Sequence, residues 1–221
     1  MAEFLKDIVW EDISLATYDT LTMLGLSTLF TVVIGLPLGI LLFLTSRGQL
    51  LQQNALYALL SFVVNVLRSV PFIILMILVI PLTRVIVGTS IGVPGSIPPL
   101  VIASAPFFAR LVETALREVD RGVIEAAQSM GATSGQIVTR VLLPEARPGL
   151  IAAITITAVT LVSYTAMSGV VGGGGLGDLA IRYGYQRFNT PVMVVTVVIL
   201  LVLVQILQSL GDRLVRRFQR K

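Results

Sequence analysis

The chain has 221 residues, of which 55% are hydrophobic and 13% are charged, and since a soluble domain carries about 25% charged residues, the composition predicts an integral membrane protein. The absence of cysteine and histidine excludes thiol and imidazole nucleophiles, disulfides and the usual zinc ligands. Neither lysine lies in the Gly-Lys-Ser/Thr setting of a phosphate-binding loop. We therefore expect no catalytic residue and no metal site. The net charge of +4 does not indicate nucleic-acid binding, because the basic residues lie between apolar stretches, as membrane topology signals do.

Five apolar stretches approach the length of about 20 residues that a helix needs to cross a bilayer. The third is the shortest and contains Pro98, Pro99 and Pro106. Because no strand-like alternation, repeat or low-complexity linker is present, we expect an all-α integral membrane protein with one transmembrane domain over residues 1–221. The expected spans are about 22–45, 56–80, 97–111, 150–171 and 191–210, and a long loop covers about 112–149.

Basic residues orient these spans, because cytoplasmic loops are enriched in arginine and lysine. With the carboxyl end inside, eleven basic residues fall on the cytoplasmic side and four, Lys6, Arg84, Arg182 and Arg187, fall outside. We therefore predict an outer amino terminus and an inner carboxyl terminus. The basic tail is expected to meet anionic lipid headgroups, and it consists of Arg213, Arg216, Arg217, Arg220 and Lys221.

The first two spans contain residues that are unusual in a membrane helix. Gly35 and Gly39 flank Pro37, and small residues at this spacing let two helices approach closely; we favour packing over a flexing hinge. Arg68 lies inside the second span, where a buried charge costs roughly 2.5–3.5 kcal/mol, so it either pairs structurally, for example with Glu113, or lines the substrate pathway. Pro71 is expected to kink this helix.

The cytoplasmic loop carries the signals of two short helices around a glycine turn. Asp120 is a suitable N-cap, and Gly131 is placed to end the first helix in a left-handed conformation. Thr133 and Gln136 form a capping-box pattern for a second helix, which we expect to stop at Pro144.

An ordered loop of this kind is either a docking element for another subunit or an amphipathic hairpin lying on the lipid headgroups. Ala126 and Ala127 would let another surface approach closely, and Glu125 would offer a charge to a basic partner. The residues alone leave these two alternatives open.

The end of the fourth span is polar, with Ser163, Tyr164 and Met167 close together. Hydroxyl groups in an apolar helix favour a face turned to a water-filled path, and the flexible thioether of Met167 suits a gate; ordinary helix packing is the alternative. The following Gly172-x-Gly174-x-x-Gly177 pattern matches the dinucleotide fingerprint only formally, since it follows a membrane span and not a strand.

The loop resembles the EAA loop of the binding-protein-dependent ABC importer permeases. The family pattern has Glu-Ala-Ala, a glycine after three further residues, and Ile-x-Leu-Pro after nine more, and here only Val141 departs from it, in place of isoleucine. The matching residues are Glu125, Ala126, Ala127, Gly131, Leu143 and Pro144.

Further segments are similar to the permeases of methionine importers in particular. They include the stretch from Arg68 to Phe72, the segment from Pro81 to Gly92, Tyr164 to Met167, and Gly174 to Gly177. The resemblance covers nearly the whole chain, from Asp12 to Arg217.

The resemblance implies a type I ABC importer permease fold in a bacterial inner membrane, as a multi-pass homodimer. Two separate ATPase subunits, which bind ATP and Mg²⁺, would each grip the loop residues listed above, and a periplasmic or lipid-anchored binding protein would deliver D- or L-methionine. The alternatives are a permease for another amino acid or small solute, such as a phosphonate or osmolyte, and an ion-coupled secondary transporter. The last would want acidic groups in mid-membrane, and none lies clearly within a span. A membrane scaffold or enzyme is a further alternative, for which we find no catalytic group set.

Overall fold

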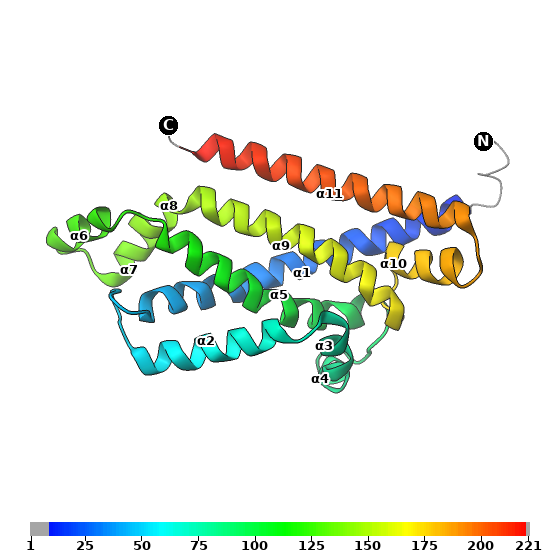
Figure 1. The fold of residues 1–221 in the computed structure, drawn as a ribbon, viewed down its shortest axis with the longest axis horizontal. Helices are drawn as coiled ribbons and strands as arrows, with labels where there is room; N and C mark the ends of the chain where they lie inside the picture. Colours follow the sequence, from blue (N-terminus) through cyan, green and yellow to red (C-terminus); the bar gives the residue numbers. More distant parts are fainter. Residues whose placement is uncertain (1–8, 220–221) are drawn as a thin grey trace. The chain divides into compact units, whose positions relative to one another are not determined.

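The structure is a computed structural model that describes residues 9–219, and within that range it consists of helices and connecting turns without strands (Figure 1). Lys6, Arg220 and Lys221, which entered the orientation and tail predictions, lie outside the described residues. The long helices are α1 (Trp10–Thr45), α2 (Asn54–Ser69), α5 (Gly92–Arg117), α9 (Arg147–Ser168) and α11 (Thr190–Phe218). The short helices are α3 (Phe72–Leu78), α4 (Ile80–Val87), α6 (Arg121–Ser129), α7 (Ser134–Ile137), α8 (Leu143–Glu145) and α10 (Gly175–Leu179), with π-helical turns at Val138–Leu142 and Ala180–Tyr185 and a 3₁₀ turn at Gly169–Val171.

Within residues 9–219, four helices are long and apolar enough to cross a membrane, namely α1, α5, α9 with its 3₁₀ turn, and α11. The bent pair α2 and α3 would make a fifth span if counted as one. Many large apolar side chains on them are exposed in the single chain. In the most apolar stretch of α11, for example, only 11% of the residues are buried. A surface of this kind requires lipid or another subunit, so the chain is a multi-pass membrane protein.

The helix that contains the third predicted span, α5, is longer than the sequence suggested. We expected a span over about 97–111, but α5 runs without interruption from Gly92 to Arg117 and includes Pro98, Pro99 and Pro106. Membrane helices tolerate proline where neighbouring groups satisfy the freed backbone carbonyls. The residues that we had assigned to the beginning of the cytoplasmic loop, from position 112 onward, therefore continue the helix.

The second predicted span, 56–80, is not one helix. α2 ends at Ser69 and α3 begins at Phe72, while Pro71 between them has an extended conformation with φ −57° and ψ 135°. A proline lacks the amide donor and disfavours helical geometry in the preceding residue. The kink that we expected at Pro71 is a complete break.

Close packing divides the chain into two compact units, and α1, α5, α9 and α11 contribute to both. The first unit contains Met1–Phe30, Val70–Ala103 and Ala158–Gln208, and the second contains Thr31–Ser69, Ser104–Thr157 and Ser209–Lys221. The first has a small core that includes Ile13, Leu176 and Val192. The second has a larger core, in which Phe43 and Phe108 from the long helices pack with residues of α6, α7 and the following π-helical turn.

Candidate functional site

Both ends of α6 are fixed by capping interactions. The Asp120 carboxylate accepts a hydrogen bond from the Gly122 amide at 2.6 Å, which confirms the predicted N-cap. After the last turn, Gly131 has a φ of +79°, and the amides of Gly131 and Ala132 donate to the carbonyls of Gln128 and Ala127. This is the glycine-terminated hydrogen-bond pattern that closes many helices, so α6 has a defined length and a defined exit direction.

The second short helix begins as predicted but ends differently. The Thr133 hydroxyl accepts from the Gln136 amide, and the Gln136 side chain accepts from the Thr133 amide at 2.9 Å, which completes the capping box. However, the chain does not stop at Pro144. It widens into the π-helical turn Val138–Leu142, and Pro144 then occupies the first turn of α8, where its missing amide costs nothing.

The two alanines of the EAA pattern have different environments. Ala127 is 4% exposed and packs, with Ile124, into the core of the second unit. Ala126 and Glu125 are exposed. We had expected both alanines on the docking side, but Ala127 faces its own chain because it lies three residues after Ile124, on the same side of the helix.

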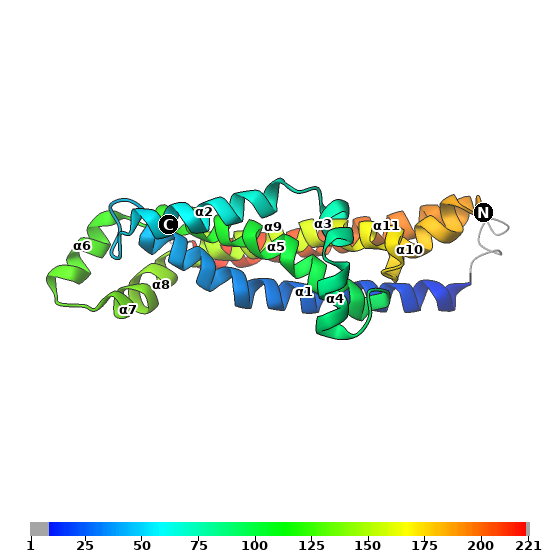
Figure 2. The same cartoon turned by 90° about the horizontal axis from the view of Figure 1, so that it is seen from below.

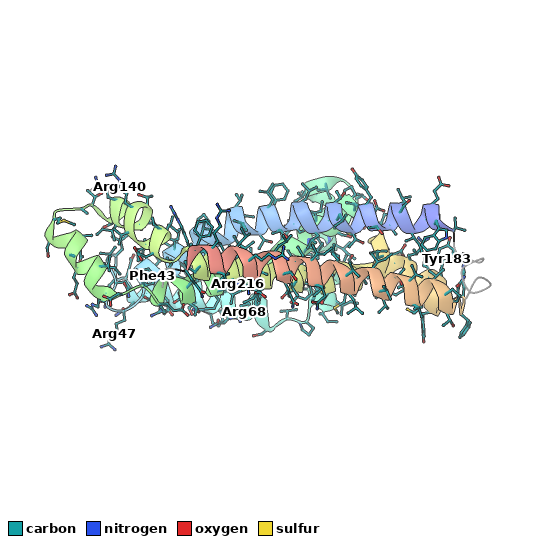
Figure 3. The ribbon with its side chains drawn as sticks, turned by 90° about the horizontal axis from the view of Figure 1, so that it is seen from above. Phe43, Arg47, Arg68, Arg140, Tyr183 and Arg216 are labelled. Atoms are coloured by element: carbon teal, nitrogen blue, oxygen red, sulfur yellow. The ribbon has the colours of Figure 1, made fainter. Side chains whose placement is uncertain are left out.

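The exposed side of α6 is a surface available to a partner. It carries Val123 and Met130, which are 42% and 82% exposed, beside Ala126. Glu125 pairs with Arg121 at 3.0 Å, and both side chains are largely exposed, so this pair contributes little stability. Figure 2 shows α6 and α7 side by side, and Arg140 extends outward from the following π-helical turn in Figure 3.

A cavity of about 350 Å³ opens next to α6 in the second unit. Its walls come from Phe43 and the α1–α2 connection at Gly48 to Leu50, from the end of α5 with Val119 after it, and from one side of α6. Among its polar wall residues are Gln49, Arg117, Arg121, Glu125 and Gln128.

A buried carboxylate organises the carboxyl-terminal half of α5. Glu113, whose side chain is 3% exposed, accepts hydrogen bonds from Arg110 at 2.6 Å and from Arg117 at 2.7 Å. The hydroxyl of Tyr57 in α2 donates to the same group at 3.1 Å. The two guanidinium partners offset the desolvation cost of burying this carboxylate.

Arg110 extends this network further along α2. Its second terminal nitrogen donates to the Ser61 hydroxyl at 2.7 Å and to the Asn65 amide oxygen at 2.9 Å. Polar groups of α2 at positions 57, 61 and 65 therefore face α5 at four-residue intervals. We did not predict this network from the sequence, although the spacing Arg110-x-x-Glu113-x-x-x-Arg117 in an apolar context was a usable signal.

Arg68 does not take part in this network. Its guanidinium lies over the ring of Phe107, 5.8 Å from the ring centre, a distance typical of a cation–π contact. Glu113, which we had considered as its partner, binds Arg110 and Arg117 instead. Arg68 itself is exposed in the single chain.

Gly35 and Gly39 lie where α1 meets α5. A methyl group on Gly35 would approach the Ala105 carbonyl to 2.9 Å, and one on Gly39 would approach the Ala109 carbonyl and Val112 to 2.6 Å. Pro37 lies inside the continuous α1. The two glycines therefore allow a close helix contact that a larger residue would prevent.

The residues proposed for the pathway lie on α9. Ser163 and Met167, four residues apart, are both exposed on one side of the helix, and Met167 is 39% exposed. Tyr164 turns away from them and stacks on Phe72, with ring centres 4.3 Å apart and planes within 3°. The structure thus brings together two segments that the resemblance singled out separately.

The glycine-rich segment after α9 is a compact turn. Gly172, Gly174 and Gly175 all have positive φ values. The amide of Leu176 then donates to the Thr20 hydroxyl of α1 at 2.8 Å. The segment follows a helix, so the strand that a dinucleotide site requires is missing before it.

Known proteins resemble this chain over most of its length. A probable D-methionine transport system permease protein of Vibrio cholerae serotype O1 is 55% identical over 202 residues, 91% of this chain and 90% of that protein. The methionine import system permease protein of Bacillus subtilis is 51% identical and covers 89% of each chain. A solved structure of the methionine ABC transporter MetNI in an inward-facing conformation superposes with a TM-score of 0.95 at 50% identity, over 97% of this chain and 100% of that one.

A family model agrees with these relatives. It describes the inner membrane component of binding-protein-dependent transport systems and matches residues 32–220. An amino acid ABC transporter with histidines, 20% identical with a TM-score of 0.75 over 93% of both chains, shares the fold. The chain therefore belongs to the family of binding-protein-dependent transport system inner membrane components.

Proposed function

We propose that this chain is the permease subunit of an ATP-driven methionine importer in a bacterial inner membrane. Two relatives that are about half identical to it over about nine tenths of their length are named as permease proteins of methionine transport or import systems. The single observation that carries the proposal is α6, a short helix capped at both ends, anchored by buried Ile124 and Ala127, with its other side exposed.

The exposed side of α6 is the proposed docking site for a separate ATPase subunit, which would hold ATP and Mg²⁺. Glu125 and Ala126 supply the contact, while Ala127 and Gly131 fix the position of the helix. Leu143 and Pro144, both partly buried in α8, support the segment from behind. Two copies of the chain would pair, and a binding protein would deliver the substrate at the outer side. The chain itself would perform no chemistry on ATP.

If α6 transmits movement of the ATPase subunit to the membrane helices, it needs a stiff connection to them. Only three residues, Glu118 to Asp120, separate α5 from α6. The Glu113 network holds α2 to the same end of α5 through Tyr57 and Arg110. A displacement of α6 by the ATPase would therefore reach α5 and α2 together.

The transport pathway is proposed to pass the side of α9 that carries Ser163 and Met167. Both residues are exposed in the single chain, so this side is free to face a second copy across a pathway. Tyr164, stacked on Phe72, would hold the helix in place behind them. Arg68, exposed and without a salt bridge within residues 9–219, remains a candidate for contact with the substrate or the partner.

Uptake of labelled methionine into vesicles tests the function directly. The vesicles would contain this chain, its ATPase subunit and its binding protein, with ATP supplied on the ATPase side. We expect accumulation that requires ATP and survives dissipation of the ion gradients. Uptake that stops when the gradients collapse, although ATP remains, would support a secondary transporter instead. The outward amino terminus and inward carboxyl terminus would be tested in the same vesicles by protease access.

A further inference from the structure

A second cavity of the second unit lies where the beginning of α9 meets the end of α11. Its volume is about 480 Å³, and its walls include Arg147 and Pro148 from α9, Pro144 and Glu145 from α8, and Arg217 and Phe218 from α11. None of these wall residues except Pro144 belongs to the proposed docking segment. The cavity is therefore separate from the proposed docking side of α6.

The charge of this cavity favours an anion. Arg147 and Arg217 form no salt bridge with an acidic residue anywhere in residues 9–219, whereas Glu145 is the single acidic residue in the wall. Two guanidinium groups against one carboxylate leave one net positive charge. Guanidinium groups bind phosphate through paired hydrogen bonds, so a phosphate monoanion matches the cavity in both charge and chemistry.

An apolar stripe leads away from the cavity along α11. Leu210, Leu214 and Phe218 follow at four-residue intervals and are 51%, 46% and 42% exposed. Residues at this spacing lie on one side of a helix, and Phe218 is also part of the cavity wall. α11 is one of the helices long and apolar enough to cross a membrane. The cavity is thus a basic pocket at the end of an exposed apolar track.

We propose that this pocket binds the headgroup of one anionic phospholipid, such as phosphatidylglycerol, with its phosphate on Arg147 and Arg217 and an acyl chain along Leu210 and Leu214. Basic pockets between membrane helices are known sites for anionic headgroups. A zwitterionic lipid carries an ammonium group that adds positive charge to a pocket that is already positive, so it binds less well. Such a site requires only that α11 spans the membrane, whatever solute the complex transports.

Native mass spectrometry of the detergent-solubilised complex, with lipid added at increasing concentration, tests the site. The probes are phosphatidylglycerol, phosphatidylethanolamine with the same acyl chains, and glycerol phosphate without acyl chains. For the R147Q/R217Q variant we expect about a tenfold loss of phosphatidylglycerol affinity, since two charge-assisted contacts are removed. Wild-type protein should bind phosphatidylethanolamine at least about tenfold more weakly than phosphatidylglycerol, because its ammonium group adds positive charge to the pocket. It should also bind glycerol phosphate at least about tenfold more weakly, because this probe has no acyl chain to lie along Leu210 and Leu214.

The matched control is R213Q/R216Q, which removes the same charge from exposed positions of α11 outside the cavity wall; Arg216 is labelled in Figure 3. A site-bound lipid predicts that this control keeps its phosphatidylglycerol affinity within about twofold, because surface attraction is weak for each charge. Equal losses of phosphatidylglycerol affinity in the two double variants would overturn the proposal. Binding of phosphatidylethanolamine or of glycerol phosphate as tight as that of phosphatidylglycerol would also overturn it. If R147Q/R217Q fails to assemble, R217Q alone in the last turn of α11 serves for the same comparison.

Discussion

The guanidinium of Arg110 donates to the carboxylate of Glu113 across 2.6 Å, and that carboxylate is almost completely buried. Arg117 binds its other oxygen at 2.7 Å, so Glu113 lies between two arginines of its own helix. Tyr57 reaches the same carboxylate from α2. One acidic residue therefore fixes both the carboxyl-terminal half of α5 and its contact with α2.

Replacing Glu113 by glutamine should destabilise the chain strongly, since it leaves Arg110 without a charged partner. Breaking a buried pair from one side typically costs about 3–5 kcal/mol. The measurement is the unfolding free energy of the solubilised protein. E125Q provides the control, because the Arg121–Glu125 pair is exposed and such pairs contribute about 1 kcal/mol or less. Equal effects of the two substitutions would contradict a structural role for Glu113.

The glycines of α1 give a second matched pair. G39A places a methyl group 2.6 Å from the Ala109 carbonyl and from Val112, and overpacking of this kind costs roughly 1–3 kcal/mol. G25A adds the same methyl group where nothing lies within 4 Å, so we expect it to be neutral or slightly stabilising. The measurement is the thermal unfolding temperature of both variants, which should fall for G39A and not for G25A. A hinge role without close packing would leave both unfolding temperatures unchanged.

Neighbouring alanines of α6 should respond differently to leucine. A127L enlarges a residue that is 4% exposed in the core of the second unit, so it should lower stability by about 1–3 kcal/mol. A126L enlarges an exposed residue and should leave the stability of the isolated chain unchanged while weakening retention of the ATPase subunit. The two readouts are thermal unfolding and co-purification. Full ATPase retention by A126L would show that this side of α6 is not the docking surface.

The left-handed turn after α6 predicts a specific glycine requirement. Gly131 has a φ of +79°, a conformation that costs a residue with a side chain about 1–2 kcal/mol. We expect G131A to lower stability by this amount and to uncouple ATP hydrolysis from uptake, and G131N to be milder, since asparagine tolerates this region. G135A is the control, because its added methyl group meets nothing within 4 Å and its φ is not positive.

Local sequence patterns predicted both ends of α6 and the start of α7, because capping depends on residues only two or three positions apart. Asp120, Gly131, Thr133 and Gln136 all act as those patterns indicated. The high proportion of apolar residues likewise predicted an integral membrane protein, because a helix that crosses a bilayer must be largely apolar. The burial of Ala127 follows from its three-residue spacing to Ile124, which places both side chains on one side of the helix, whereas the family pattern does not distinguish Ala127 from Ala126.

Other features depend on contacts that the sequence does not display. The π-helical turn at Val138–Leu142 removes the stop that Pro144 would otherwise impose, and no local rule predicts such a turn. The Glu113 network unites residues of α2 and α5 that are about fifty positions apart. The stacking of Tyr164 on Phe72 similarly joins distant segments, and only the three-dimensional structure reveals it.

Cysteine cross-linking from α6 to the ATPase subunit tests the central claim most directly, because the natural chain contains no cysteine and each variant therefore carries a single reactive thiol. We expect A126C to cross-link to the ATPase subunit in the assembled complex, and T160C, on α9, to give no such product. Absence of a cross-link from A126C, or its modification by an impermeant reagent added to the outside of intact cells, would contradict the assignment of α6 as the docking helix.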